Sequence, residues 1–424
     1  MFKSLNDAQK WIESVEKFGQ KYDLKRMITA CEMLGHPEKS FKSIHIGGTN
    51  GKGSTLTFLK EMLRAEGYQV GTYTSPYLVH FNERITLNDK YISDEDFLFY
   101  INKIYTFQKH YLTLYNDQIT FFELLTLIAF LYFQKQQPDI VLIEVGLGGT
   151  LDATNVITPV LSIITTIGYD HQEVLGNSLE SIALNKLGIV KEGIPLVTGI
   201  EQIALLPLFI SYTNKKQSPF HHVALNDYKI LDFSVPTKFS YLSETYCINM
   251  ASEYQVKNAI CALLAARVLN DTTPYNISID SQKIGVKRAF WPGRFEIIGS
   301  VILDGAHNLP GLQATLETVR NYYRNHEIRV VFTVMKDKQY EPMIQLLDQY
   351  ADQLCFTEIP YPRCASAELL YTLSNHPKKS MNNNFLAAFN HLLPKSPQSI
   401  LLITGSLYFI SMIRPTVMAH KNTV

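Results

Sequence analysis

The amino-acid sequence predicts an α/β fold made of two successive units with mostly parallel sheets. Short apolar, β-branched runs alternate with helical stretches along the chain, which is the order that produces sheets covered by helices. The runs 140–145 and 161–167 are almost continuously apolar, as expected of parallel strands buried on both faces. After the WPGR segment at 291–294 the alternation restarts. We therefore expect one domain over 1–294 and a second over 295–424.

The elements can be placed in order. A strand at 44–46 runs into a glycine-rich turn, and in the helix that follows Leu56, Leu59 and Leu63 share one face by their i, i+3, i+7 spacing. Short aromatic and β-branched runs between 201 and 249 suggest small strands beside the main sheet. In the second unit, strands are predicted at 301–303, 329–335, 354–357 and 400–404.

The composition is that of a globular protein without a polyanionic partner. The chain has 424 residues, 46% of them hydrophobic and 18% charged, which is long enough for two domains. Thirty-nine basic residues balance thirty-nine acidic ones, whereas a nucleic-acid binder usually has a basic excess. We expect no nucleic-acid partner, so an anionic substrate would have to be held by local groups.

Cysteine usage and hydropathy indicate the compartment. The five cysteines are scattered, odd in number and without CxxC spacing, which argues against disulfides or a zinc site and fits a reducing cytoplasm. The charged segment 1–18 does not resemble a signal peptide. The most apolar stretch, 121–133, contains Glu123 and is too short to span a bilayer. We expect a cytoplasmic monomer without a membrane partner.

The segment 45–55, HIGGTNGKGST, is the clearest candidate for a phosphate-binding loop. Glycines let the backbone approach a polyphosphate, whose charge the loop N–H groups and the helix N-terminus complement. Lys52 would reach the β- and γ-phosphates, and the hydroxyl of Ser54 or Thr55 could contact phosphate or Mg²⁺. The strict Walker A pattern is not met, because its first glycine is absent and another glycine follows the lysine.

Polar residues follow two predicted strands. Glu144 lies at the end of 140–145, and Asp170 and His171 come after the next run. The carboxyl edge of a parallel sheet is where α/β proteins bind ligands, and Mg²⁺ prefers oxygen ligands. Residue type alone leaves His171 open between a metal ligand and a helix cap, and leaves 152–155 open between a functional role and a turn.

Eight motifs occur in order across nearly the whole chain. They are IHIGGTNGKGST, TSPYLVHFNERI, TFFELLT, IEVGLGGTLDATNVI, TTIGYDHQEVLG, WPGRFE, DGAHN and TGSLYF. Together they resemble the folylpolyglutamate synthase/dihydrofolate synthase family, a branch of the Mur ligases. The resemblance implies a P-loop-type ATP- and folate-binding N-terminal domain, a smaller Rossmann-like C-terminal glutamate-ligase domain, and an active site in the cleft between them.

The resemblance also implies the site residues. The ATP contacts would be Thr49, Asn50, Gly51, Lys52, Gly53, Ser54, Asn258, Arg294, Asp304 and His307. The Mg²⁺ ligands would be Ser75, Glu144, His171 and Lys186, the lysine as a carbamate. The folate pocket would include Thr120, Phe121, Phe122, Glu123, Leu151, Asp152 and Ala153, with Ser406 on the glutamate side. The catalytic residues would be Lys52, Lys186, His171 and Arg294.

Five positions depart from the family pattern. Tyr77 stands where histidine is common, Thr150 where arginine is common, and Leu309 where proline is usual. Asn185 and Leu187 flank the lysine in place of the usual glutamate and alanine. None of the five is a predicted phosphate or metal contact, so they bear on substrate preference more than on the type of reaction.

The resemblance implies an enzyme that ligates L-glutamate to a folate-type carboxylate with ATP and Mg²⁺, through an acyl phosphate. TFFE and LDA make dihydropteroate a further substrate, and the sequence leaves single and dual activity open. Two alternatives are a cell-wall Mur ligase and a regulatory ATPase. A cell-wall Mur ligase normally has an additional UDP-binding domain, for which the about forty residues before the loop are too few. A regulatory ATPase without ligase activity gives no reason for DGAHN in a second domain.

Overall fold

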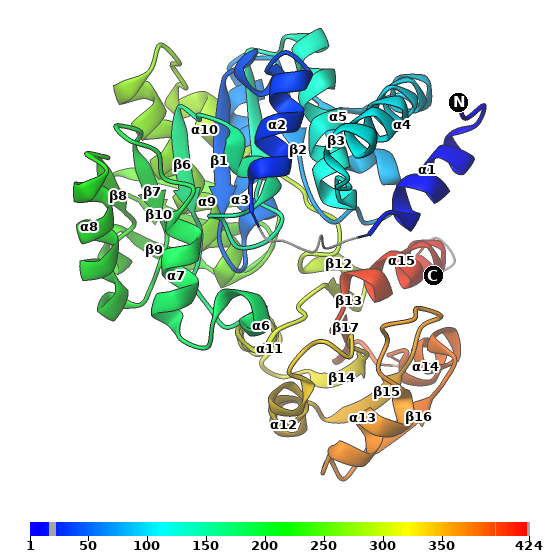
Figure 1. Cartoon of the computed structure of the whole chain (residues 1–424). Coiled ribbons are helices and arrows are strands. Elements are labelled where there is room, and N and C mark those ends of the chain that lie inside the picture. Colours follow the sequence, from blue (N-terminus) through cyan, green and yellow to red (C-terminus); the bar gives the residue numbers. More distant parts are fainter. Residues whose placement is uncertain (17–22, 395, 422–424) are drawn as a thin grey trace. The chain divides into compact units, whose positions relative to one another are not determined.

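This computed structural model describes residues 1–16, 23–394 and 396–421, which form two compact units (Figure 1). The first unit comprises Met1–Ile167, Asn177–Leu225 and Asn258–Val286. The second comprises Gly168–Gly176, Asn226–Lys257 and Lys287–Val424. Each unit is therefore assembled from segments that are separated in the sequence.

The first unit contains an eight-stranded sheet in the order β4-β3-β2-β5-β1-β6-β7-β8. Its strands are β1 (Ser43–Gly47), β2 (Val70–Tyr73), β3 (Ile85–Leu87), β4 (Lys90–Tyr91), β5 (Ile140–Glu144), β6 (Leu161–Ile164), β7 (Leu196–Thr198) and β8 (Phe220–His222). The strands from β2 to β8 in this order are parallel, and β3 and β4 are antiparallel. The chain leaves β1 toward β2 on one side and leaves β6 toward β7 on the other. The carboxyl ends of these two neighbours therefore mark the switch point at which α/β sheets bind ligands.

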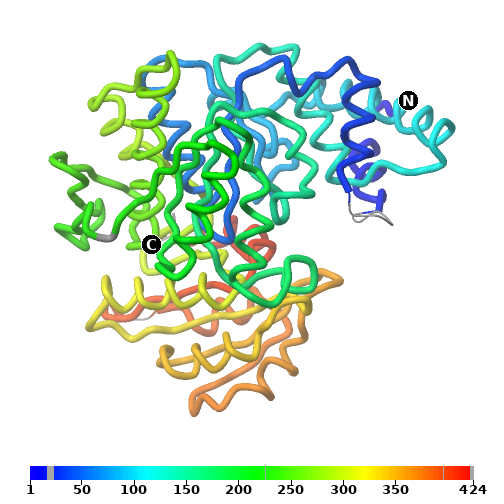
Figure 2. The backbone as a smooth tube through the Cα atoms, turned by 60° about the vertical axis from the view of Figure 1, so that its left-hand side comes forward, coloured from blue at the N-terminus to red at the C-terminus, as the bar shows by residue number. Residues whose placement is uncertain are grey.

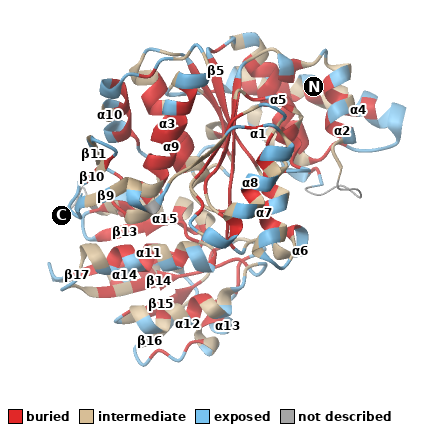
Figure 3. Cartoon of the chain, turned by 90° about the vertical axis from the view of Figure 1, so that its left-hand side faces the viewer, coloured by how far each residue is buried: buried red, intermediate tan, exposed pale blue. Residues whose placement is uncertain are grey.

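Helices cover both faces of this sheet. They are α1 (Leu5–Ser14), α2 (Lys25–Met33), α3 (Lys52–Ala65), α4 (Asp94–Tyr115), α5 (Phe121–Gln136), α7 (Leu179–Leu187), α8 (Leu206–Lys215), most of α9 (Glu253–Thr272) and α10 (Ile279–Arg288). Figure 3 shows buried strands with α3 and α9 on one face and α5 and α7 on the other. Leu56, Leu59 and Leu63 are buried, which confirms the predicted inner face of α3.

Helix α5 is apolar around its whole circumference, and every residue from Glu123 to Phe133 is buried. A helix of this kind belongs inside a core, and here α1 and α4 pack with it in one cluster of buried apolar side chains. Figure 2 shows these helices, drawn in blue and cyan, side by side near the N-terminus. The apolar stretch 121–133 is therefore a core helix.

Three predicted elements differ from the structure. The run 161–167 is a strand only to Ile164, because the threonines that follow bond to the glycine-rich loop. The run 329–335 ends as a strand at Phe332. Within 201–249, where strands were expected, Leu206–Lys215 is a helix that begins with a proline in its first turn, a position where proline's missing N–H costs nothing.

The second unit is built on a six-stranded sheet in the order β12-β13-β17-β14-β15-β16. Its strands are β12 (Glu296–Ile298), β13 (Val301–Asp304), β14 (Glu327–Phe332), β15 (Gln353–Thr357), β16 (Lys379–Asn382) and β17 (Ser399–Thr404). Its helices are the short α6 (Gln172–Leu175), α11 (Leu309–Tyr322), α12 (Tyr340–Tyr350), α13 (Ala367–Leu373), α14 (Phe385–Leu392) and α15 (Leu407–Lys421). A small antiparallel sheet joins β9 (Tyr228–Asp232), β10 (Thr237–Tyr241) and β11 (Glu244–Ile248).

In the six-stranded sheet, β12 is antiparallel and the other strands are parallel. Alternate residues such as Val330 and Phe332 face one core cluster, which α11, α12 and α13 complete. Helices α14 and α15 contact strands of the same sheet, and Figure 1 shows them on its other face. Both units are thus α/β with mostly parallel sheets, which confirms the predicted fold class.

Gly285 marks a close approach of α10 to α3 and provides a test of the packing. A Cβ atom at Gly285 would lie 2.4 Å from the backbone N and 2.5 Å from the Cα of Met62. Replacing a helix glycine by alanine normally gains about 1 kcal/mol, whereas overpacking costs about 1–3 kcal/mol or more. Because the clash is with backbone, we expect Gly285→Ala to lower the free energy of unfolding by about 2 kcal/mol in urea denaturation.

The matched control is Ile284→Ala on the same helix, since the Ile284 side chain is 46% exposed. We expect this control to lose less than about 1 kcal/mol. A Gly285→Ala variant as stable as wild type would contradict the close backbone approach.

Candidate functional site

A glycine-rich loop connects β1 to α3 in the first unit. Gly48 and Gly51 have φ values of +141° and +83°, conformations that glycine adopts without strain. A Cβ atom at Gly48 would lie 2.0 Å from Oγ1 of Thr165, and one at Gly51 would lie 2.3 Å from Oδ1 of Asn258. The loop therefore needs glycine at both positions for its shape and for space, and it brings the predicted ATP contact Asn258 against Gly51.

The residues that follow β6 hold this loop. The N–H of Thr49 donates to the carbonyl of Thr166 (2.8 Å), and the N–H of Asn50 donates to Oγ1 of Thr166 (3.0 Å). The hydroxyl of Thr165 donates to the carbonyl of Asn50 (2.6 Å). Sequence analysis gave Thr165 and Thr166 no role. Two threonines directly after a buried strand were the available signal, because hydroxyl groups bond to nearby backbone.

Lys52 is the first residue of α3 and folds back over the loop. Its Nζ donates to the carbonyls of Gly48 and Thr49, both at 3.2 Å. The N-terminus of a helix attracts anions because its first N–H groups have no partner within the helix. The ammonium and the helix N-terminus thus place positive charge around the loop, as a polyphosphate site requires.

Glu144 and Ser75 lie together at the same carboxyl edge. Glu144 ends β5 and is 5% exposed. Its Oε2 accepts a hydrogen bond from the backbone N–H of Ser75 at 3.2 Å, and Ser75 follows β2, the neighbour of β5. Two predicted metal ligands of the first unit are therefore brought into contact.

Lys186 on α7 is buried, with 4% exposure. Its Nζ donates to the carbonyl of Gly48 at 3.1 Å. From its residue type alone it would be a surface lysine, and only the family resemblance assigned it to the site. The structure brings it to the glycine-rich loop.

The start of α5 presents the aromatic residues of the predicted folate pocket. The ring of Phe122 packs on Gly146, where a Cβ atom would lie 2.4 Å from Cζ of the ring. The Phe122 ring also stacks with Tyr73 at a centroid distance of 5.9 Å. The guanidinium of the buried Arg84 lies 5.8 Å from the ring centroid of Phe121. Sequence analysis did not single out Arg84 or Tyr73.

The carboxylate of Glu123 is hydrogen-bonded to other residues of the protein. The N–H of Thr120 donates to its carboxylate at 2.8 Å, which caps α5. The Nε of the buried Arg26 lies 3.1 and 3.0 Å from its two oxygens. Thr120 and Glu123 therefore fix the N-terminus of the helix that carries the two phenylalanines.

The loop after β5 contains the other predicted folate contacts. Leu151 is 43% exposed, whereas Asp152 and Ala153 are buried. Oδ2 of Asp152 accepts the N–H of Leu147 at 2.8 Å, and Oδ1 accepts the N–H and the hydroxyl of Thr154. Burial raises the pKa of Asp152 although these hydrogen bonds oppose the shift.

In the second unit, Asp304 organises the DGAHN turn. Its Oδ2 accepts the hydroxyl of Tyr254 (2.5 Å) and the N–H of Phe295 (2.8 Å). Its Oδ1 accepts the N–H of Ala306 (2.8 Å) and the hydroxyl of Thr315 (3.1 Å). Four donors match the capacity of a carboxylate. Burial raises the pKa of Asp304, opposed by the hydrogen bond from Tyr254.

Arg294 and His307 lie on either side of Gly305. Nη1 of Arg294 donates to the Gly305 carbonyl at 3.4 Å, and Nδ1 of His307 lies 2.9 Å from the same oxygen. A carbonyl only accepts, so Nδ1 of His307 carries the proton. Burial and then the charge of Lys338 lower the pKa of His307 to about 4. The imidazole is therefore neutral at pH 7.

Asp170 anchors the segment that carries His171. Its Oδ1 pairs with Nζ of Lys338 at 2.6 Å, and its Oδ2 accepts Nδ2 of Asn308 at 3.0 Å. Burial would raise the pKa of Asp170, but His307, Lys338 and His171 outweigh it and hold that pKa well below its usual value. His171 has a φ of +51°, which costs a residue other than glycine about 1 kcal/mol or more.

Ser406 is buried where β17 ends. Thr404 pairs with Asp304 across β17 and β13, so TGSLYF and DGAHN meet at the carboxyl edge of the second sheet. The side chain of Leu407 covers Gly305, where a Cβ atom would lie 2.2 Å from its Cδ2. The second unit therefore collects Asp304, His307 and Ser406 at one edge.

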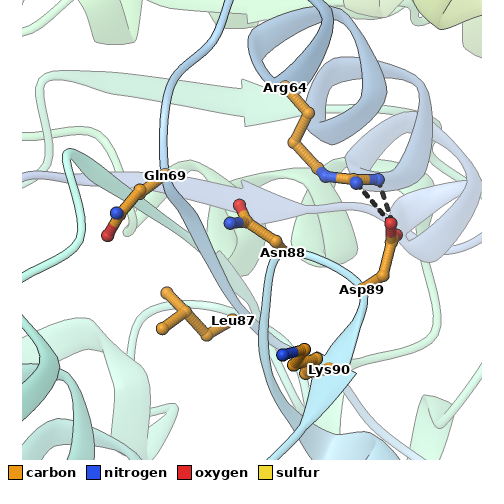
Figure 4. Close-up of a pocket in the computed structure, with 6 residues that line it drawn as sticks. All are labelled: Arg64, Gln69, Leu87, Asn88, Asp89 and Lys90. Carbon is orange, nitrogen blue, oxygen red and sulfur yellow. Dashed lines mark hydrogen bonds and ion pairs between the residues drawn. The ribbon is translucent and has the colours of Figure 1, made fainter.

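Two surface cavities lie away from these residues. One, of about 380 Å³, is lined by Arg64, Gln69, Leu87, Asn88, Asp89 and Lys90. Figure 4 shows Arg64 paired with Asp89 there. Gln69 precedes β2, so this cavity lies at the amino end of that strand, opposite the glycine-rich loop. A second cavity, of about 440 Å³, includes Lys42 and Pro195, which precede β1 and β7.

Within residues 1–16, 23–394 and 396–421, no group of three or more His, Cys, Asp or Glu side chains is placed to hold a metal ion. The predicted magnesium ligands are not a group of this kind, because they include a serine and a lysine. No helix in the described part of the chain is both long and apolar enough to cross a membrane.

Comparison with known proteins gives the family. The Mur ligase middle domain matches residues 46–266, and the Mur ligase glutamate ligase domain matches 293–407. A dihydrofolate synthase/folylpolyglutamate synthase of Bacillus subtilis is 40% identical over 428 residues, which are 98% of this chain and 99% of that protein. The crystal structure of a folylpolyglutamate synthase from Thermotoga maritima has a TM-score of 0.84 at 30% identity and covers 98% of this chain and 97% of its own. A solved complex of folylpolyglutamate synthase with AMPPCP and folate has a TM-score of 0.85 at 26% identity and covers 98% of this chain and all (100%) of its own.

Two matched Mur ligase domains, which lie on the sheets and loops described above, first define the class. Within that class, the chain belongs to the folylpolyglutamate synthase/dihydrofolate synthase family, since a family member is 40% identical over nearly the full length of both chains. The resemblance indicated by the eight motifs is confirmed.

The ion pair of Asp170 with Lys338 can be tested by stability measurements. The two side chains are 10% and 11% exposed. Removing one partner of a nearly buried pair leaves a charge without compensation, so we expect Lys338→Met to lower the free energy of unfolding of the second unit by about 3 kcal/mol. In a double-mutant cycle with Asp170→Asn, the combined loss should be clearly smaller than the sum.

Lys336→Met is the control, because Lys336 is exposed two residues away. We expect it to change the stability by less than about 0.5 kcal/mol. Additive losses in the cycle would show that Asp170 and Lys338 do not act as a pair.

Proposed function

We propose that this chain ligates L-glutamate to folate-type carboxylates with ATP, releasing ADP and phosphate. Family membership supports this, and so do the folate and AMPPCP in the solved complex of a related synthase. The observation that carries the proposal is the glycine-rich loop with Lys52 folded over it, at the same carboxyl edge as Ser75 and Glu144. This edge is where a parallel sheet binds a nucleotide.

The first step activates the carboxylate. A carboxylate oxygen of the folate attacks the γ-phosphorus of ATP, the bond to the β-phosphate oxygen breaks, and an acyl phosphate and ADP form. The protein's task in such a transfer is to position the groups and to neutralise spreading charge. The loop N–H groups and Lys52 would hold the phosphates, and Asn258 would contact the nucleotide beside Gly51.

Magnesium fits the oxygen donors of the first unit. Ser75 and Glu144 offer a hydroxyl and a carboxylate, which suit this hard cation. An ammonium at Lys186 would repel it, so Lys186 fits only as a carbamate, whose oxygens can bind a metal. When bound, Mg²⁺ would neutralise phosphate charge. His171 belongs to the second unit, and its metal role remains a prediction.

In the second step the amine nitrogen of L-glutamate attacks the acyl carbon, phosphate leaves, and the amine loses a proton to solvent. Exclusion of water protects the acyl phosphate from hydrolysis. Arg294, Asp304, His307 and Ser406 are proposed to serve the nucleotide and glutamate from the second unit. Since four donors already surround Asp304, its effect would pass mainly through the backbone next to Arg294 and His307.

We further propose that dihydropteroate is a substrate beside folates that already carry glutamate. The name of the Bacillus subtilis relative combines both activities. The phenylalanines at the start of α5 and the loop around Asp152 would contact the pterin-bearing substrate in either reaction.

The test is a phosphate-release assay with ATP and Mg²⁺ and either dihydropteroate or tetrahydrofolate, with and without L-glutamate. We expect release to require both the pterin and glutamate, and mass spectrometry to show the product heavier by glutamyl units. Phosphate release that ignores both co-substrates would instead support a regulatory ATPase.

Lys52→Met should reduce ligation by roughly 100-fold or more, because a charge that stabilises the transferring phosphoryl group is lost. Lys60→Met is a matched control on the same helix, since Lys60 pairs with Glu61 rather than with the loop. A Lys52→Met enzyme with near wild-type turnover would remove the phosphate-loop assignment.

The carbamate on Lys186 makes a separate prediction. In ¹³C-bicarbonate, wild-type protein should give a carbamate carbon signal that Lys186→Ala lacks, because an alanine has no amine to carry CO₂. The variant should also lose metal-dependent turnover, and added bicarbonate should not restore it. The carbamate is ruled out if the variant shows the same signal or wild-type turnover.

A further inference from the structure

Three buried polar side chains form a hydrogen-bonded relay that links the strand before the glycine-rich loop to the loop after β5. His45 lies on β1, is 0% exposed, and its Nε2 is 2.8 Å from Oγ1 of Thr154. The hydroxyl of Thr154 also bonds to Oδ1 of Asp152. All three residues belong to the first unit.

The donor and acceptor of each hydrogen bond in this relay are fixed. A carboxylate only accepts, so the hydroxyl of Thr154 donates its one proton to Asp152. That hydroxyl can then only accept from His45, so Nε2 of His45 carries the proton. Within residues 1–16, 23–394 and 396–421, Nδ1 of His45 has no hydrogen-bond partner, and an unpaired acceptor is more easily tolerated in a core than an unpaired N–H.

The charge state of His45 agrees with this assignment. Burial, with a smaller contribution from Lys191, lowers the pKa of His45 to about 3. The imidazole is therefore neutral at pH 7 and offers a single N–H.

At the other end of the relay, Asp152 reaches the aromatic residues at the start of α5. Oδ2 of Asp152 accepts the N–H of Leu147 at 2.8 Å, and the backbone of Gly146 also donates to this carboxylate. The ring of Phe122 rests on Gly146, and a Cβ atom there would lie 2.4 Å from Cζ of the ring and 3.1 Å from Oδ2 of Asp152. The carboxylate thus sets the shape of the loop on which Phe122 packs.

We propose that His45 and Thr154 are positioning residues for the folate substrate: through Asp152 they fix the Gly146–Leu147 turn against Phe122. This inference rests on the proposed function, in which Phe122 contacts the folate. Because both oxygens of Asp152 are occupied by the loop, Asp152 acts on the substrate through the turn. The relay starts on β1 but ends at the folate side, so it should affect folate binding more than ATP binding.

The test compares isosteric pairs of variants in the ligation assay. Thr154→Val removes the hydroxyl and keeps the shape, whereas Thr154→Ser keeps the hydroxyl. We expect Thr154→Val to raise KM for the folate substrate about ten-fold, the effect of one lost hydrogen bond to a charged group, with KM for ATP within about two-fold. Thr154→Ser should restore the folate KM to near wild type.

A second pair of variants tests the His45 end of the relay. His45→Leu removes the donor, and His45→Gln keeps an N–H donor near the position of Nε2. We expect a raised folate KM in the first variant and a largely restored value in the second. An unchanged folate KM in both Thr154→Val and His45→Leu, or equal rises in the folate and ATP KM values, would overturn the proposal.

Two measurements separate this inference from the proposed function. ¹⁵N NMR of the wild-type protein should show His45 protonated at Nε2, and protonation at Nδ1 would refute the relay even in an active ligase. Calorimetric binding of folate to wild type and Thr154→Val tests positioning without turnover. If the wild type binds folate but does not ligate glutamate, the proposed reaction is wrong. The folate affinities of wild type and Thr154→Val then still test the relay. A wild type that binds no folate overturns both.

Discussion

The hydrogen bonds between the loop after β1 and the two threonines after β6 fix the conformation of the glycine-rich loop at the carboxyl edge of the first unit's sheet. A glycine-rich loop has no side chains to pack, and its glycines gain the most freedom when the chain unfolds. Its conformation must therefore be set from outside, here by Thr165 and Thr166. Each bond contributes only about 1 kcal/mol net. The close contact at Gly48 adds a steric limit, and Lys52 and Lys186 both donate to the carbonyl of Gly48.

Buried aspartates do comparable work in the loops of both units. Asp152 lies in the loop after β5 and Asp304 is the last residue of β13. Each accepts hydrogen bonds from backbone N–H groups of the adjoining loop. Ionised groups are costly to bury unless hydrogen bonds replace water, and the raised pKa of each shows that burial is not fully offset. A carboxylate is suited to this role because it accepts about four hydrogen bonds and donates none.

Local patterns predicted β1, β5, β6, β13, β14, β15, β17 and the glycine-rich loop, but not β2, β7 or β16. Buried parallel strands and phosphate loops have short-range signatures. The same patterns did not predict α8, because a run of 10 residues is too short for its periodicity to separate a helix from strands. The hydrogen bond from Lys186 to Gly48 joins residues 138 positions apart, and the pairing of Lys338 with Asp170 joins residues 168 positions apart. No local periodicity encodes such contacts. The family resemblance assigned Lys186 to the site, but it assigned no role to Thr165, Tyr254 or Lys338.

The second unit is discontinuous in sequence, and this determines the order in which its contacts can form during synthesis. The first unit is complete once residue 286 has been made, since all of its segments lie before that point. Asp170 and Tyr254 leave the ribosome before Lys338 and Asp304 exist. Domains usually fold as units beginning from the N-terminus. Segments 168–176 and 226–257 can therefore complete their contacts within the second unit only after residues 287–424 have been made, although β9, β10 and β11 can pair with one another earlier.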